Sequence, residues 1–198
     1  MKISGKFILK VAGTLTVISL VVAALLGLVD SVTRDKIAAI EAENTRIAMS
    51  AVAPEGSEFG DKMEITDALA AAASAQGGKL VELYPMTNGG ADAGYVMKIS
   101  ASGSQGTISM MVGIDMDGAV TGVSIVTNSE TSGIGSKVMS NEPLTNGTRV
   151  LDQFIGKSAA DGVLSVGSNV DAITGATVST KGVTTGVNAA LAAAGVIG

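Results

Sequence analysis

The chain of 198 residues is 46% hydrophobic and contains no Cys, His or Trp. This composition excludes disulfides, thiolate nucleophiles, Ser-His-Asp triads and metal, haem or iron–sulfur centres held by Cys or His, so any redox function needs an organic cofactor or a partner. The net charge is −5, and the part of the chain from residue 30 onward is three units more negative because the basic cluster of Lys2, Lys6 and Lys10 precedes it. We therefore expect no nucleic acid among the partners.

Residues 11–29 form an uncharged stretch dominated by Val, Leu, Ile and Ala. As an α-helix this stretch would be about 29 Å long, which matches the hydrocarbon core of a bilayer. A core helix of a soluble protein seldom runs this far without a charged face, so the stretch predicts a single transmembrane helix. A cleavable signal peptide is the alternative, but residues 28–34 offer no convincing A-x-A-like cleavage site.

The three lysines before this span predict its orientation, because basic flanking residues are retained on the cytoplasmic side. We expect a cytoplasmic N-terminus and a single-pass protein in the inner or plasma membrane, in contact with the lipid bilayer. Everything beyond about residue 30 should then be extracytoplasmic.

Helical periodicity continues after the span. Ile37, Ile40, Ala48 and Val52 recur at near-helical spacing over residues 31–53, and the Pro-Glu-Gly run at 54–56 ends the pattern. This predicts a helical stalk. A second helix is expected over residues 67–75, which are rich in Ala and are followed by two glycines.

After this helix, hydrophobic residues alternate with polar ones at a period of two. This predicts strands over residues 80–83, 95–100, 107–114 and 119–127. Asp115-Met-Asp-Gly118 lies between the last two strands. This run lacks the later ligands and the closing Glu of an EF-hand, so it predicts a hairpin turn. A short helix is expected around 150–155, and a final helix over about 179–194 has Val183, Val187, Leu191 and Ala194 on one face.

These elements predict an α+β fold with three parts. Residues 1–30 are the cytoplasmic tip and transmembrane helix, residues 31–53 are the stalk, and residues 54–198 are a single extracytoplasmic domain. In this domain an antiparallel sheet is flanked by helices.

Chemistry concentrates in the stretch from Asp171 to Thr180, where small residues surround two threonine hydroxyls just before the final helix. A helix start presents unpaired N–H groups and a partial positive charge, which suits a phosphate, and Lys181 would add to that field. The residues alone leave an alternative open. Ser179 or Thr180 could simply cap the helix, with Gly175 making a turn.

The run Thr174-Gly175-Ala176-Thr177 resembles the flavinylation motif Ser/Thr-Gly-Ala-Thr of the FMN-binding domain family. That family is found in the G subunit of Rnf ion-translocating oxidoreductase (electron transport) complexes and in the related C subunit of sodium-translocating NADH:quinone reductases. In the family the last threonine of the motif carries FMN through a phosphoester bond. The resemblance therefore implies covalent FMN on Thr177, and Asp171 with Ala172 matches the usual approach to the motif.

A second segment, residues 129–137, resembles the family's Glu-Thr-Pro-Gly-Leu-Gly run, which lies against the flavin ring. The match departs at Ser132, where Pro is usual, and at Asn128, where His is frequent. By position, the resemblance implies that the following residues lie at the cofactor: Glu130, Thr131, Gly133, Ile134, Gly135 and Lys137. Glu130 either orients this loop or bonds near the ring, and the alternative is a solvated loop acid.

A softer match covers residues 151–157, which resemble a Gln-Phe-x-Gly-Lys run of the family. We expect Phe154 of this run in the core rather than at the flavin.

Taken together, the resemblance implies a membrane-anchored subunit of a ferredoxin:NAD oxidoreductase complex of the Rnf type that relays electrons through FMN without turning over a substrate of its own. Its partners would be the integral-membrane and redox subunits of that complex, and a flavin transferase would attach the cofactor. Chain length favours the G subunit. The alternatives are a C-type subunit of the quinone reductase, a free-standing extracytoplasmic flavoprotein, and a structural subunit that never receives flavin.

Overall fold

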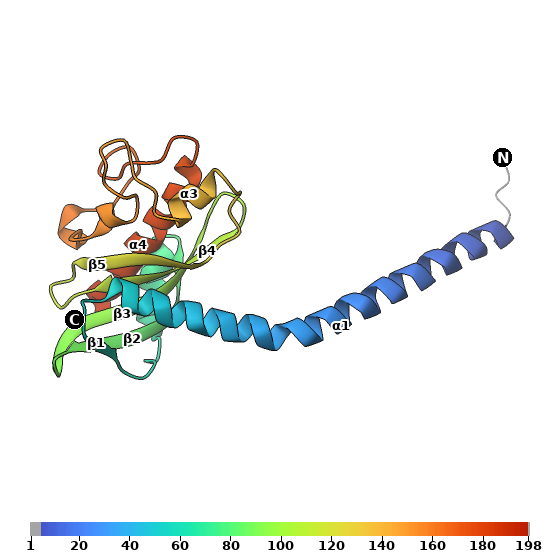
Figure 1. The fold of residues 1–198 in the computed structure, drawn as a ribbon, viewed down its shortest axis with the longest axis horizontal. Helices are drawn as coiled ribbons and strands as arrows, with labels where there is room; N and C mark the ends of the chain where they lie inside the picture. The colour runs from blue at the N-terminus through green and yellow to red at the C-terminus, as the bar shows by residue number, and fades with distance from the viewer. Residues whose placement is uncertain (1–4, 198) are drawn as a thin grey trace. The chain divides into compact units, whose positions relative to one another are not determined.

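The computed structural model describes residues 5–197 (Figure 1). The chain divides into two compact units, one ending at Glu43 and one beginning at Asn44. A single helix, α1 (Gly5–Val52), provides the described part of the first unit and the first residues of the second.

The first unit is helical throughout its described part. An 18-residue window within Ile8–Val52 has a mean hydropathy of 2.4, and none of that window is buried. By length and composition α1 can therefore cross a membrane, which confirms the predicted long apolar helix at the N-terminus.

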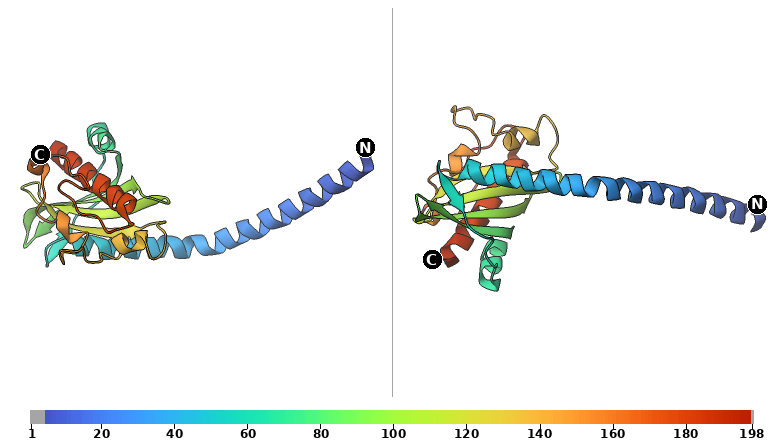
Figure 2. Two further views of the ribbon diagram at one scale, coloured as in Figure 1. Left: turned by 90° about the horizontal axis from the view of Figure 1, so that it is seen from above. Right: turned by 60° about the horizontal axis from the view of Figure 1, so that its bottom comes forward.

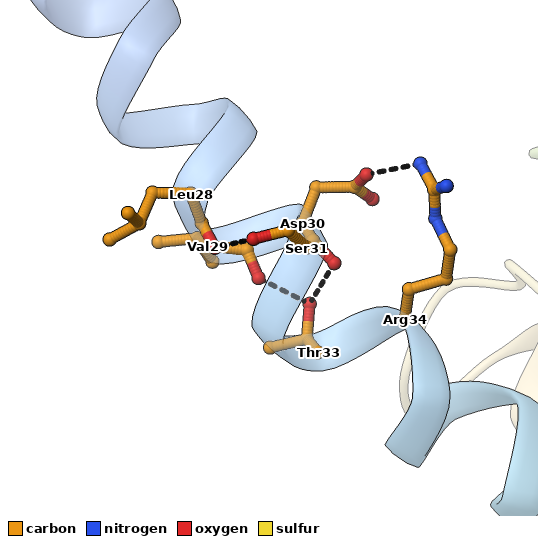
Figure 3. A network of polar contacts seen from close by, with 6 residues as sticks. All are labelled: Leu28, Val29, Asp30, Ser31, Thr33 and Arg34. Carbon is orange, nitrogen blue, oxygen red and sulfur yellow. Dashed lines mark hydrogen bonds and ion pairs between the residues drawn. The ribbon is translucent and has the colours of Figure 1, made fainter.

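Polar side chains in and beside the apolar part of α1 bond within the helix (Figure 3). The Thr33 hydroxyl donates to the Val29 carbonyl at 2.8 Å, and Arg34 pairs with Asp30 at 2.6 Å. Further in, the hydroxyls of Thr14 and Thr16 each donate to the carbonyl four residues earlier, at 2.9 Å. Hydroxyls satisfied in this way can enter hydrocarbon without an unpaired donor.

The second unit contains a five-stranded antiparallel sheet in which each strand pairs with the next along the chain. Its strands are β1 (Ser57–Phe59), β2 (Gly78–Asn88), β3 (Ala91–Ser102), β4 (Thr107–Ile114) and β5 (Val120–Thr127). The Asp115 carboxylate accepts from the N–H groups of Asp117 and Ala119 at 3.0 and 2.8 Å, which confirms the predicted hairpin turn between β4 and β5.

Helices cover both faces of the sheet. On one face lie α2 (Asp67–Ala75) and α4 (Thr177–Ile197), whose Val183 and Val187 are fully buried in the main core (Figure 2). On the other face the end of α1 buries Met49 and Val52 in a second cluster. Residues 108–114 of β4 are accordingly buried on both sides of the strand.

The predicted fold class is confirmed, with differences in detail. The helix over 67–75 and the strand over 107–114 have the expected bounds, whereas β2 and β3 are longer and α4 begins two residues earlier. The helix expected around 150–155 is only a 3-10 turn, Asp152–Phe154. Three short elements were not predicted: β1, α3 (Gly135–Met139), which lies within the second matched segment, and a 3-10 turn at Ala159–Asp161.

Candidate functional site

Thr177 is the first residue of α4 and its side chain is exposed. A tight turn precedes it, in which the Ala176 N–H donates to the Ile173 carbonyl at 2.9 Å. Gly175 makes this turn with a φ of +84°, a conformation that disfavours any residue with a Cβ. Because Ala176 is buried, the turn is anchored on one side of Thr177 while the hydroxyl remains accessible.

The start of α4 has free main-chain donors. Among residues 5–197 no hydrogen-bond acceptor pairs with the N–H groups of Thr177, Val178 or Ser179. The two hydroxyls that could have capped the helix lie inside α4, and among residues 5–197 neither accepts from a main-chain N–H. They only donate: Thr180 to the Ala176 carbonyl at 3.0 Å, and Ser179 to Glu130. The alternative of a simple N-cap is therefore wrong, and the free N–H groups suit an anion placed beside Thr177.

Glu130 connects the start of α4 to the loop at residues 104–105 and to its own loop. Its Oε1 atom accepts from the main-chain N–H groups of Ser104 and Gln105, at 2.8 and 3.2 Å, and its Oε2 atom accepts from the Ser179 hydroxyl. The alternative of a solvated loop acid is thus wrong, because the carboxylate is held by three donors from two elements.

The loop that follows Glu130 packs against the same helix start. A Cβ built on Gly135 would lie 2.8 Å from both Glu130 Cβ and Ser179 Oγ, so only glycine allows this approach. At the exposed tip, Gly133 has a φ of +81° and donates its N–H to the Ser136 hydroxyl at 2.8 Å. Ile134 is 52% exposed and offers an apolar surface there.

Asp171 is held by the third matched segment. Its main-chain N–H donates to Gln153 Oε1 at 2.8 Å, and its carbonyl accepts from Gln153 Nε2 at 3.0 Å. The Asp171 carboxylate also accepts from Asn146 at 3.4 Å. The neighbouring Phe154 is fully buried, which confirms its predicted place in the core.

The structure thus joins the two motif regions through Glu130 and Gly135, both of which contact Ser179 at the start of α4. Thr131, Gly133 and Ile134 lie in the connecting loop, and Thr174 is exposed in the turn before Thr177. Lys137 lies on α3, and among the described residues its side chain has no ion pair. The sequence did not indicate that Ser179 is a partner of Glu130, or that Ser104 and Gln105, in the turn between two expected strands, contact Glu130. The glycines at 103 and 106, between the strands expected over 95–100 and 107–114, indicated a turn there but not its partner.

Comparison with known families agrees with this arrangement. Residues 103–192 match the FMN-binding domain, and residues 1–52 match the RnfG N-terminal region. The chain is therefore a membrane-anchored protein with an FMN-binding domain.

Relatives that cover nearly the whole chain narrow this class. The G subunit of the Na⁺-translocating ferredoxin:NAD⁺ oxidoreductase complex of Acetobacterium woodii is 32% identical over 197 residues, covering 94% of this chain and 91% of the relative. The G subunit of the ion-translocating oxidoreductase complex of Methanosarcina acetivorans is 32% identical, with 94% of each chain covered. The crystal structure of Shewanella oneidensis NqrC is 20% identical with a TM-score of 0.44, covering 71% of this chain and 65% of that one. The chain belongs to the family of G subunits of Rnf ion-translocating oxidoreductase complexes, and the resemblance drawn from its motifs is confirmed.

Proposed function

We propose that Thr177 carries FMN covalently, through a phosphoester bond to its hydroxyl, and that the chain relays electrons within an Rnf-type ferredoxin:NAD oxidoreductase complex. The observation that supports this most is the exposed Thr177 hydroxyl beside three main-chain N–H groups without partners among residues 5–197. A phosphate placed there would receive hydrogen bonds and the favourable end of the dipole of a 21-residue helix.

The bound FMN would supply the electron-transfer chemistry, and the protein residues would hold and orient it. The free N–H groups of Thr177, Val178 and Ser179 would bind the phosphate oxygens. Gly133 would let the main chain approach the ring closely, and Ile134 would cover part of it with an apolar surface.

The remaining proposed site residues shape these two parts. Asp171, Thr174, Gly175 and Ala176 form the approach and the turn that presents Thr177. Thr131 accepts main-chain hydrogen bonds from Ile134 and Ser136, at 3.3 and 3.2 Å, and so closes the loop. Glu130 and Gly135 join this loop to α4, and Lys137 adds positive charge on the adjoining helix.

Attachment needs an activated donor, because a threonine hydroxyl does not esterify a free phosphate monoester at a useful rate. We propose a flavin transferase that uses a flavin dinucleotide. The Thr177 oxygen forms a bond to the flavin phosphorus, the pyrophosphate P–O bond breaks, the nucleoside monophosphate leaves, and a base of the transferase takes the hydroxyl proton. The exposure of Thr177 makes this attack possible on the folded domain.

For location, we propose that residues 1–30 include a helix across the inner or plasma membrane with its N-terminus in the cytoplasm and its sides in lipid. The stalk (31–53) and the FMN-binding domain (54–198) would then be extracytoplasmic, with residues 44–52 of the stalk packed on the domain. Other subunits of the complex, both integral-membrane and redox-active, would be its partners. The G-subunit relatives favour this assignment over a quinone-reductase C subunit and over a free-standing flavoprotein.

The attachment is tested by producing the full chain together with a flavin transferase and measuring the fluorescence of the denatured protein in a gel. Thr177→Ala should lose the signal. Thr148→Ala, which alters another exposed threonine, should keep it and serves as the control. A signal that survives in Thr177→Ala would contradict the assignment, and protein without flavin in native membranes would favour the structural subunit.

A further inference from the structure

The β3–β4 loop lies beside the start of α4, although it is far from the flavin motifs in sequence. The loop is a tight hairpin over residues 103–106, closed by a hydrogen bond from the Gly103 N–H to the Gly106 carbonyl at 2.7 Å. At its tip, the N–H groups of Ser104 and Gln105 both point at one oxygen of Glu130. The other oxygen of Glu130 receives the Ser179 hydroxyl, two residues after Thr177.

Glycines make this arrangement possible. A Cβ on Gly103 would lie 2.8 Å from Ile108 Cδ1 and would also meet the Glu130 carboxylate, while Gly135 touches Glu130 from another segment. On α4, a Cβ on Gly182 would lie 2.6 Å from the Ser102 carbonyl oxygen and 3.1 Å from Gly103 Cα. The helix that begins with Thr177 therefore packs directly on the hairpin, with Glu130 held between them.

We propose that residues 103–106 form a third side of the FMN site, next to the start of α4 and the 131–135 loop. In this proposal Glu130 and Ser179 are positioning residues that fix residues 103–106 relative to Thr177. This inference rests on the proposed attachment of FMN at Thr177. It adds to it a segment that none of the sequence motifs includes and a pair of side chains that act on the flavin through the protein.

Hydrogen bonds to a carboxylate are stronger than neutral ones, so three of them hold the hairpin, the 131–135 loop and the first turn of α4 in one arrangement. The reduction potential of a bound flavin depends on the protein groups around its ring. Releasing Glu130 would let the hairpin and the loop move apart and would change that environment without removing the hydroxyl that carries the cofactor.

The test compares Glu130→Ala, Glu130→Gln and Ser179→Ala in the full chain produced with a flavin transferase. Glu142→Gln is the matched control, because the Glu142 side chain is exposed and has no hydrogen bond or ion pair among the described residues. Two quantities are measured: covalent flavin by fluorescence of the denatured protein, and the oxidised-to-reduced ratio of the flavin in a redox titration of the native protein.

We expect all variants to keep covalent flavin. In Glu130→Ala the oxidised-to-reduced ratio at a fixed potential should change about tenfold, which corresponds to about 59 mV for a one-electron couple. Ser179→Ala and Glu130→Gln should change it less, because each keeps part of the network, and Glu142→Gln should not change it. The double variant Glu130→Ala/Ser179→Ala should equal Glu130→Ala, because the Ser179 hydrogen bond depends on Glu130.

The two proposals fail in different ways. Flavin-loaded Glu130→Ala and Ser179→Ala with the wild-type ratio would overturn the positioning role and leave the attachment intact. Wild-type protein that receives no covalent flavin would overturn both. If Glu130→Ala does not fold, Ser179→Ala still decides the question, since it removes one hydrogen bond and also predicts faster hydrogen exchange at the amides of Ser104 and Gln105 in flavin-free protein.

Discussion

The side-chain amide of Gln153 pairs with the main chain of Asp171 in both directions, accepting from its N–H at 2.8 Å and donating to its carbonyl at 3.0 Å. Gln153 also donates to the Val150 carbonyl at 2.8 Å. The side chain thus takes the place of a neighbouring strand for a segment that has none. It fixes the chain six residues before Thr177.

Gln153→Ala should therefore loosen the approach to the flavin motif. The loss of these hydrogen bonds should lower the free energy of unfolding by about 1–3 kcal/mol. It should also increase proteolysis within residues 171–176, measured by timed digestion of the full chain. Gln153→Glu is the matched variant, because it keeps the acceptor for the Asp171 N–H and loses the donor to the Asp171 carbonyl. Its stability and its rate of digestion should therefore lie between those of the wild type and Gln153→Ala. Equal digestion of all three proteins would contradict this role.

A substitution at Phe154, the residue after Gln153, measures how much the core contributes to stability at this place in the chain. Its side chain is fully buried, and Phe154→Ala should cost about 3–5 kcal/mol of unfolding free energy because it leaves a cavity. Ile155 is 53% exposed, so Ile155→Ala should change stability by less than about 0.5 kcal/mol. Denaturant unfolding of the detergent-solubilised chain measures both. Similar costs for the two variants would mean that Phe154 does not lie in the core.

The sequence predicted correctly those elements whose structure follows from the composition and hydrophobic pattern of their own residues. The Ala-rich helix 67–75 and the strand 107–114 were placed correctly because composition and alternation act within each segment. β1 was missed because its three residues are a strand only through pairing with β2, as Ser57 pairs with Asn88. α3 was missed because its five residues begin with Gly135, and glycine is a poor helix former.

The candidate site divides in the same way. The hydroxyl at Thr177 and the turn at Gly175 follow from the order of residues in one short segment. The roles of Glu130 and Ser179 do not, since their partners lie 26 and 49 residues away along the chain. From sequence alone, a short hydroxyl side chain near a helix start such as Ser179 predicts an N-cap. Its actual partner, the Glu130 carboxylate, reaches it only in the folded chain.

The packing of α1 on the sheet depends on Gly122. A Cβ built there would lie 2.8 Å from Val52 Cα, a main-chain atom that cannot move aside without shifting the helix end. Gly122→Ala should lower the free energy of unfolding by about 1–3 kcal/mol through this overpacking. The control is Gly195→Ala near the end of α4, where a Cβ meets nothing within 4 Å and helix propensity improves. Equal stability of the two variants would contradict the close contact.

Tyr84 should give the domain a distinctive response to alkaline pH. Burial, the hydrogen bond that its hydroxyl donates to Glu82 at 3.0 Å and the negative charge of Glu82 raise the pKa of Tyr84 from 10.0 to about 12. The protonated phenol is thus favoured in the folded state, so its contribution to stability is present below pH 10 and is lost as the pH rises through about 12.

The chain has two tyrosines, and Tyr84→Phe removes one of them. The variant should lose the step near pH 12 in the tyrosinate absorbance of the folded protein. It should also show a smaller loss of unfolding free energy between pH 10 and 12 than the wild type. A wild-type titration without a step above pH 11, about midway in this window, would show that burial and Glu82 do not raise the pKa of Tyr84.

The proposed orientation can be tested directly because the natural chain has no cysteine, so each introduced thiol is unique. Lys6 lies before the apolar span, and Met63 lies in the second unit and is 37% exposed. If the basic N-terminus stays in the cytoplasm, a membrane-impermeant maleimide should label Met63→Cys in cells with an intact inner or plasma membrane. Lys6→Cys should react only after that membrane is permeabilised. Labelling in the opposite order would place the FMN-binding domain in the cytoplasm, and labelling of both before permeabilisation would mean that residues 11–29 do not span the membrane.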